Sequence, residues 1–274
     1  MKSSRANKWQ KSRPSQPAKP VFGGPRRQPG KNEAYITGWN GVRECLASPH
    51  VKVVQAWIDP RKLSREDYER IRPYSRQIEE LKGKETPYGE LSQGIGALVR
   101  LPEWDDLDDL LDGLEAKGVP PLLVALDQVE DPMNLGQILR TCEGAGVHGL
   151  LVPKHRAIHL NQTVAQVSQG AFAWVPLIEV TNLRHTLDSA KQRGLWVIGT
   201  AAGEGSRPWY QVDFRENSLL VMGAEGKGLR RLTVESCDFL VELPMAGRLD
   251  SLNVGAATAA VLYEAVRQRH SAPD

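Results

Sequence analysis

Three short stretches of the chain combine polar side chains, glycines and prolines in patterns that could do chemistry. In the first, residues 126–140, Asp131 and Pro132 form a turn after an apolar run, and Asn134 and Arg140 follow in a helical pattern. Asn134 could cap that helix, and an arginine side chain is long enough to reach back toward the helix entrance. Taken locally, a plain helix cap with a surface arginine is the favoured interpretation.

The second stretch is the glycine-rich turn Gly223-Ala224-Glu225-Gly226-Lys227-Gly228, which also follows an apolar run. It lacks the four-residue spacer of a P-loop and is no G-x-G-x-x-G dinucleotide fingerprint. Glycines allow close backbone approach and unusual dihedral angles, which would suit the wrapping of an adenosine. The alternative is an ordinary turn that caps a helix.

The third stretch begins with Leu243-Pro244-Met245 and enters a helix near Ser251 and Asn253. Ser251 could cap this helix, whereas Asn253 is a poor helix former for a first turn. Small residues follow and would let another element pack very close, although simple core packing explains them as well: Gly255, Ala256, Ala257 and Ala259.

The elements around these stretches alternate between apolar runs and helical patterns. We expect strands near 122–126, 149–152, 175–180, 195–200, 219–222 and 239–243, and helices near 135–144, 163–172, 183–192, 229–236 and 252–268. This alternation predicts an α/β fold with a mainly parallel sheet covered on both faces. Ligands bind beyond the carboxyl ends of such strands, where all three stretches lie.

The rest of the chain divides by composition. We expect a disordered basic tail at 1–32, a small α/β domain at 33–100, an acidic helical linker at 101–119 and the large domain at 120–270. In the linker, leucines recur with helical spacing and seven carboxylates occupy the other face, which predicts one amphipathic helix over 101–118.

Together the three stretches resemble the signature motifs of the SpoU (TrmH-like) RNA 2′-O-ribose methyltransferases of the SPOUT superfamily. Residues 131–140 match D-P-x-N-x-G-x-x-x-R, residues 223–228 match G-x-E-G-x-G, and residues 243–254 match L-P-M…S-L-N-V. Residues 168–171 resemble the family's S-x-G-A segment. Residues 36–44 and 93–95 resemble the L30e-like RNA-binding domain found in front of many members, with Asn40 and Ser92 where relatives commonly carry histidine.

The resemblance implies a SPOUT α/β knot with a deep C-terminal trefoil, a homodimer, and S-adenosylmethionine as cofactor. The catalytic residues that it implies are Asn134, Arg140, Glu225, Ser251 and Asn253. The cofactor-binding residues that it implies are Thr200, Gly223, Ala224, Glu225, Gly226, Leu243, Pro244, Met245 and Leu252. No metal is needed.

The implied reaction is an in-line attack of a ribose 2′-hydroxyl on the methyl group of the cofactor. The family assigns Arg140 as the base, but a guanidinium almost never deprotonates. We therefore expect Arg140 to orient the target phosphate and hydroxyl. The expected target is a guanosine of 23S ribosomal RNA; transfer RNA is the alternative, and a non-enzymatic RNA-binding protein or a nicotinamide or flavin dehydrogenase are the rival classes.

The charge of the chain is unevenly distributed. Residues 1–32 hold nine of the 35 basic residues and no acid, so the other 242 residues carry 26 bases against 33 acids. Such a block of charge indicates an arm for a polyanion, here RNA, or a merely solubilising tail. If the arm binds RNA, removing residues 1–32 weakens RNA binding, most at low salt, and leaves cofactor binding unchanged.

The remaining features argue against other classes. No run is long enough to span a membrane, and no secretory signal is recognisable, so we expect a cytoplasmic protein without a membrane partner. Three scattered cysteines predict neither disulfides nor a zinc site. His155 and His159 could bind a metal if helical, although no third ligand is apparent. Trp9 or Trp39 could stack an RNA base.

Overall fold

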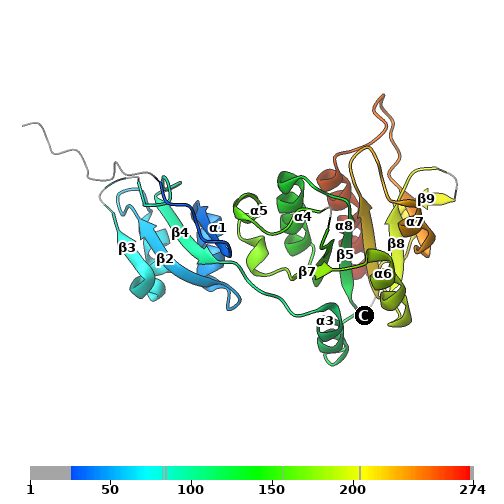
Figure 1. Cartoon of the computed structure of the whole chain (residues 1–274), viewed down its shortest axis with the longest axis horizontal. Helices are drawn as coiled ribbons and strands as arrows, with labels where there is room; N and C mark the ends of the chain where they lie inside the picture. Colours follow the sequence, from blue (N-terminus) through cyan, green and yellow to red (C-terminus); the bar gives the residue numbers. More distant parts are fainter. Residues whose placement is uncertain (1–25, 82, 84, 156, 204, 272–274) are drawn as a thin grey trace, which may run out of the picture.

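The computed structural model describes residues 26–271 except 82, 84, 156 and 204, and these residues form two sheets joined by a linker (Figure 1). The first sheet has the order β1-β4-β2-β3; β1, β4 and β2 are antiparallel, and β3 pairs with β2 in parallel. Its elements are β1 (Glu33–Thr37), α1 (Trp39–Ala47), β2 (Lys52–Ile58), α2 (Arg65–Ile71), the 3-10 helix η1 (Arg72–Gln77), β3 (Ile78–Glu80) and β4 (Ile95–Arg100).

This small sheet buries side chains on both faces. On one face Ile36, Ala56 and Ala97 pack with Val42 and Cys45 of α1 in the main core cluster. On the other face a separate aromatic cluster forms: Tyr35, Trp57, Leu91 and Leu98, with Leu81 and Tyr88 against them. The aromatic cluster belongs to the small sheet alone, whereas the cluster on the α1 face is continuous with the core of the second sheet. Of the expected basic tail, residues 1–25, including Trp9, lie outside the described residues.

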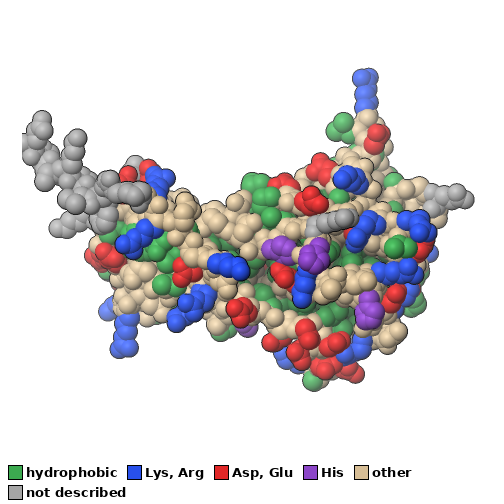
Figure 2. Space-filling model, viewed as in Figure 1, with side chains coloured by type: hydrophobic (Ala, Val, Ile, Leu, Met, Phe, Trp, Pro, Cys, Tyr) green, Lys and Arg blue, Asp and Glu red, His purple; other side chains and the backbone are tan. Residues whose placement is uncertain are grey.

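The linker helix is shorter than the leucine spacing predicted. α3 (Leu107–Glu115) begins at residue 107 because Asp106 caps it, accepting from the amides of Asp108 and Asp109, while residues 101–106 are not helical. Leu107 and Leu111 join a core cluster of the second sheet, so the helix packs on that sheet rather than spanning free solvent. Its carboxylates gather on the opposite face (Figure 2), where Arg193 pairs with Asp112.

The second sheet has seven strands in the order β7-β6-β5-β10-β8-β11-β9, and all of its pairings are parallel. Its first elements are β5 (Leu122–Asp127), α4 (Pro132–Gly144), β6 (Gly149–Pro153), α5 (Gln162–Val167), η2 (Ala171–Ala173), β7 (Leu177–Val180) and α6 (Leu183–Gln192). The chain continues with β8 (Trp196–Thr200), β9 (Ser206–Pro208), η3 (Trp209–Gln211), β10 (Ser218–Gly223), α7 (Arg231–Glu235), β11 (Phe239–Glu242) and α8 (Val254–His270).

The central strands of this sheet are covered on both faces, as their continuous apolar runs predicted. Alternate residues of β5 point into different clusters: Leu122, Val124 and Leu126 pack with residues of α4 and α8, and Leu123 and Ala125 pack with residues of α3 and α6. The predicted α/β fold with a mostly parallel sheet is confirmed. Short β9, at the sheet edge, was not predicted because three residues carry too little pattern.

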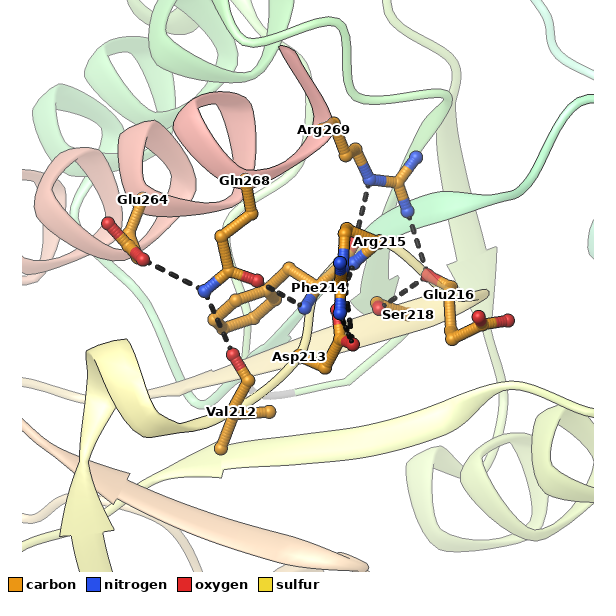
Figure 3. Close-up of polar contacts among 9 residues, drawn as sticks. All are labelled: Val212, Asp213, Phe214, Arg215, Glu216, Ser218, Glu264, Gln268 and Arg269. Atoms are coloured by element: carbon orange, nitrogen blue, oxygen red, sulfur yellow. Dashed lines mark hydrogen bonds and ion pairs between the residues drawn. The ribbon is translucent and has the colours of Figure 1, made fainter. Parts of the chain in front are cut away.

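The last turn of α8 binds two distant segments at the amino edge of the sheet. Arg269 donates to the carbonyl oxygens of Phe214 and Glu216 (Figure 3) and to those of Pro120 and Pro121, at 2.8–2.9 Å. Gln268 accepts from the amide of Phe214 at 2.8 Å and donates to the carbonyl of Val212 at 3.0 Å. These bonds join the C-terminal helix to the entrance of the large domain and to the connection before β10.

Candidate active site

The three chemistry-bearing stretches meet at the carboxyl edge of the seven-stranded sheet. They follow β5, β10 and β11, and the parallel register sets Gly223 at the end of β10 beside Asp127 at the end of β5. On the other side of β8, Val241 of β11 pairs with Thr200. The prediction that these loops share one edge is therefore confirmed.

A cavity of about 440 Å³ opens between the loops that follow β8, β10 and β11, and the stretch after β5 contributes no residue to its lining. It is lined by Thr200, Ala201, Ala202, Met222, Gly223, Ala224, Glu225, Gly226, Gly228, Val241, Glu242, Leu243, Met245, Asp250, Ser251, Leu252, Val254 and Ala257. Every residue expected to bind the cofactor is in this lining except Pro244, which stands between two lining residues. The volume lies in the range of small-molecule sites, about 300–1,000 Å³.

The glycine-rich loop folds back on the end of its own strand. A Cβ placed on Gly223 would lie 2.3 Å from the carbonyl carbon of Gly228, which no side chain tolerates. The amide of Gly228 donates to the carbonyl of Ala224 at 2.8 Å, and both Gly226 and Gly228 have positive φ angles. The glycines are needed for this tight reversal, which presents loop backbone to the cavity.

Asn134 and Asn253 are brought together although they are 119 positions apart. The Nδ2 of Asn253 donates to the Oδ1 of Asn134 at 2.9 Å. The Oδ1 of Asn253 accepts from the amide of Gly255 at 2.9 Å, so Asn253 is the N-cap of α8. The hydrogen bond between the two amides fixes the start of α8 against the start of α4.

Two predicted helix caps were wrong. Asp131, not Asn134, caps α4, accepting from the amide of Met133 at 3.0 Å. Asn253 takes the place predicted for Ser251, because α8 begins two residues later than the sequence pattern suggested. A cap needs extended backbone and a short polar side chain, which explains why an asparagine occurs at the beginning of this helix.

The other expected catalytic residues lie on exposed surface. Glu225 and Ser251 line the cavity, whereas Arg140 does not and lies on the solvent-facing side of α4. None of these three side chains has a hydrogen bond or ion pair with the described residues. Unlike the two asparagines, they are therefore available to a ligand.

One residue at this edge was missed by the sequence analysis. Asp127 is fully buried at the end of β5, where it pairs with Arg230 at 2.6 Å and accepts from the Thr233 hydroxyl at 2.7 Å and from the Arg230 amide at 2.9 Å. These contacts hold the chain where it leaves the glycine-rich loop. A carboxylate ending an apolar run was the available signal, since a buried charge needs partners.

In the small domain, the two segments that resemble an RNA-binding domain lie against each other. The Gln93 side chain accepts from the amide of Trp39 at 2.7 Å, and a Cβ on Gly38 would meet the Ser92 hydroxyl at 3.9 Å. Asn40, Ser92 and Gln93 are exposed at this corner, and Trp39 is half-buried against the core. The Trp39 ring is therefore only partly available for stacking.

The described residues contain no candidate metal site and no reactive thiol. No cluster of three or more His, Cys, Asp or Glu side chains is found there. His155 and His159 lie on an irregular segment, so they do not share a helix face, and His159 pairs with Glu179 at 2.7 Å. Burial raises the pKa of Cys237 to about 12, and it also raises the pKa of Cys45 and of Cys142, so all three thiols stay protonated.

Comparison with known proteins agrees with this geometry. The model of the SpoU rRNA Methylase family matches residues 121–263. The 23S rRNA (guanosine-2′-O-)-methyltransferase RlmB of Ralstonia nicotianae is 54% identical over 168 residues, which cover 61% of this chain and 66% of that protein. Its namesake from Shewanella oneidensis is 40% identical over 255 residues, covering 88% of this chain and 100% of that protein.

A solved structure extends the similarity to both sheets. The SpoU methyltransferase AviRb from Streptomyces viridochromogenes, in complex with AdoMet, matches 88% of this chain and 92% of its own with a TM-score of 0.69 and 28% identity. No helix within the described residues is long and apolar enough to cross a membrane. The family model covers more than half of the sequence and the Shewanella relative aligns over its whole length, so the chain belongs to the SpoU rRNA methylase family.

Proposed function

We propose that this SpoU-family RNA methyltransferase transfers a methyl group from S-adenosylmethionine to the 2′-hydroxyl of a guanosine in 23S rRNA. The observation that carries the proposal is the cavity at the carboxyl edge, which collects eight of the nine residues expected to bind the cofactor. The target follows the names of the Ralstonia and Shewanella relatives, both 23S rRNA guanosine-2′-O-methyltransferases.

The lining of the cavity fits this cofactor. Met222, Leu243 and Met245 supply an apolar wall, and the backbone of the glycine-rich loop supplies hydrogen-bonding groups. The Thr200 hydroxyl is already used, since it donates to the carbonyl of Val221 at 3.2 Å. We therefore assign Thr200 to shaping the cavity and the loop backbone to recognising the adenosine.

The cofactor supplies a methyl group on a sulfonium, which leaves as a neutral thioether. The chain must hold the attacking oxygen in line with that methyl group and move a weakly acidic proton. Arg140 keeps its five N–H donors available for the target phosphate and hydroxyl. Because its guanidinium does not act as a base, the proton passes to the phosphate that Arg140 orients.

Further parts of the proposal concern assembly. Exposed apolar side chains surround the start of α8 and the outer side of α4: Met133, Leu249, Leu252 and Tyr263, exposed by 47%, 75%, 42% and 54%. The segment between β11 and α8 projects from the body (Figure 1). A second copy of the chain would cover such a surface, so we propose a homodimer.

Other features of the resemblance belong to the same proposal. We propose the trefoil knot around β10, β11 and α8, the small domain as the RNA-binding domain, residues 1–32 as an RNA-binding arm, and a cytoplasmic location. β11 lies across β8 from β10, and α8 returns to pack on α4 and on β10. This return of the chain supports the proposed knot.

The test combines cofactor binding with RNA mapping. Calorimetry should detect S-adenosylmethionine binding to the protein, and its absence would remove the methyltransferase proposal. Mapping 2′-O-methyl groups in total RNA from a deletion strain should show the loss of one guanosine methylation in 23S rRNA. Loss of a transfer RNA methylation, with every ribosomal site retained, would contradict the target.

A further inference from the structure

The free edge of the small sheet is bound by two glutamines of the large domain. Within the described residues β1 pairs with β4 on one side only. On its other side Gln162 accepts from the amide of Tyr35 at 2.7 Å and donates to the carbonyl of the same residue at 2.6 Å. Gln166 does the same at Thr37, at 2.9 Å and 3.0 Å. Each side-chain amide thus replaces one peptide group of a neighbouring strand.

The spacing of the two elements makes this pairing possible. Along a strand, the backbone N–H and C=O groups that face one edge recur at every second residue, about 6.6 Å apart. Helix positions i and i+4 lie about 6 Å apart along the helix axis. Tyr35 and Thr37 on β1 therefore match Gln162 and Gln166 on α5 in register. A one-residue slip of the strand would break all four hydrogen bonds.

A second set of contacts holds α1 against the segment after α5. A Cβ on Gly170 would lie 2.5 Å from the Cβ of Glu44, so the Glu44 side chain packs directly on the backbone of Gly170. The Ser48 hydroxyl donates to the carbonyl of Ala173 at 2.6 Å, and the Trp174 indole donates to Glu44 at 3.0 Å. The 168–171 segment that resembles S-x-G-A thus lies at the contact between the domains.

We infer that Gln162 and Gln166 are positioning residues that hold the small domain in one orientation, and that this orientation selects which nucleotide of a bound RNA reaches the cavity. The inference rests on the proposed function, because it needs the small domain to bind RNA. The contacts between the glutamines and β1 involve no charge, so they persist at the salt concentrations that weaken RNA binding. Because the glutamines bind backbone groups of β1, they fix the register between β1 and α5 and the orientation of the small domain.

The first experiment tests the contact itself. Hydrogen exchange measured by NMR should show protected amides at Tyr35 and Thr37, and in the Q162A/Q166A variant both should exchange fast. The amide of Ile36, which faces β4, should stay protected and is the internal reference. The variant T163A changes an exposed residue of the same helix and is the matched control. Unprotected Tyr35 and Thr37 amides in the native protein would overturn the inference.

The second experiment tests the consequence for the reaction. In Q162A/Q166A we expect kcat on ribosomal RNA to fall about tenfold or more, because a misplaced nucleotide loses alignment, while KM for RNA is unchanged. Calorimetry should give native affinity for S-adenosylmethionine, which shows that the large domain is folded. Q162N/Q166N, whose side chains are one methylene too short, should behave like the alanine variant.

Mapping of methylated positions separates this inference from the proposed function. Methylation at neighbouring nucleotides in the alanine variant would support selection by orientation. Native kcat and native selectivity, despite fast exchange at Tyr35 and Thr37, would overturn it. If the native protein methylates no ribosomal RNA, the proposed function fails, while the exchange data still report on the domain contact.

Discussion

Two arginines of the large domain differ in how their N–H donors are used. Arg269 at the amino edge donates to four backbone carbonyls, and burial lowers its pKa. Arg140, in the third turn of α4, is exposed, with no partner among the described residues. A side chain that uses four of its five N–H donors within the fold has a structural task. An arginine such as Arg140, whose donors remain free on a helix of the candidate active site, is available to a substrate.

The largest expected effect follows the free arginine. R140A should lower the rate of methyl transfer by about 10²–10³-fold, since it removes donors that act on the reacting groups. Its free energy of unfolding should stay within about 0.5 kcal/mol of native, because the exposed side chain has no hydrogen bond or ion pair with the described residues to lose. Single-turnover kinetics and urea unfolding measure the two quantities. R184A, at an exposed position of α6, is the control, and an equal loss of rate there would remove the special role of Arg140.

The second prediction concerns the satisfied arginine. R269A should lower the free energy of unfolding by about 3 kcal/mol, because four carbonyl oxygens lose their donor. The stability of R269K should fall between that of the native protein and that of R269A, since one ammonium group cannot reach all four carbonyl oxygens. In urea unfolding followed by fluorescence, native stability of R269A would contradict the assignment. Cofactor affinity of the folded protein should be unchanged.

The smallest effect involves His148, near Arg269. Burial, and then the charge of Arg269, lower the pKa of His148, and its Nδ1 accepts from the amide of Leu122 at 3.0 Å. Below the ordinary histidine pKa of about 6.5 the unfolded chain takes a proton that the folded chain refuses. Stability should therefore decline from pH 7 to pH 5, by no more than about 1 kcal/mol after solvent screening. H148Q should remove the part of this decline that His148 causes. A pH profile of stability that is the same in H148Q and in the native protein would contradict the role of His148.

The position of the cavity at the carboxyl edge could be predicted from the sequence, whereas the helix caps and the start of the linker helix could not. Apolar runs located the strands, and the stretches after β10 and β11 supplied most of the cavity lining, whereas the stretch after β5 supplied none of it. The caps were wrong because Asp131 and Asn253 compete locally with neighbours of equal capping ability, and only the backbone decides between them. The linker helix was predicted too long, since the leucine spacing includes Leu101, whereas the helix begins only after its N-cap, Asp106.

Contacts between distant segments were beyond local patterns. The Asn134–Asn253 bond, the Asp127–Arg230 pair and the glutamine contacts with β1 join residues more than 100 positions apart. Gln162 and Gln166 carry no signal in the sequence, because a glutamine on a short helix is ordinary until an unpaired strand lies beside it. Such pairings become visible only when the fold places a free edge in reach.

The docking of α3 has a consequence for how this protein can be divided. Leu110 fills the space where Gly149 has no side chain, since a Cβ there would lie 2.7 Å from Leu110, and Leu107 and Leu111 cover the sheet beside it. A fragment cut at residue 120 would leave this surface exposed to water and prone to aggregation. We therefore expect the smallest stable fragment of the large domain to begin at Asp106, because α3 covers the second sheet and belongs structurally to it.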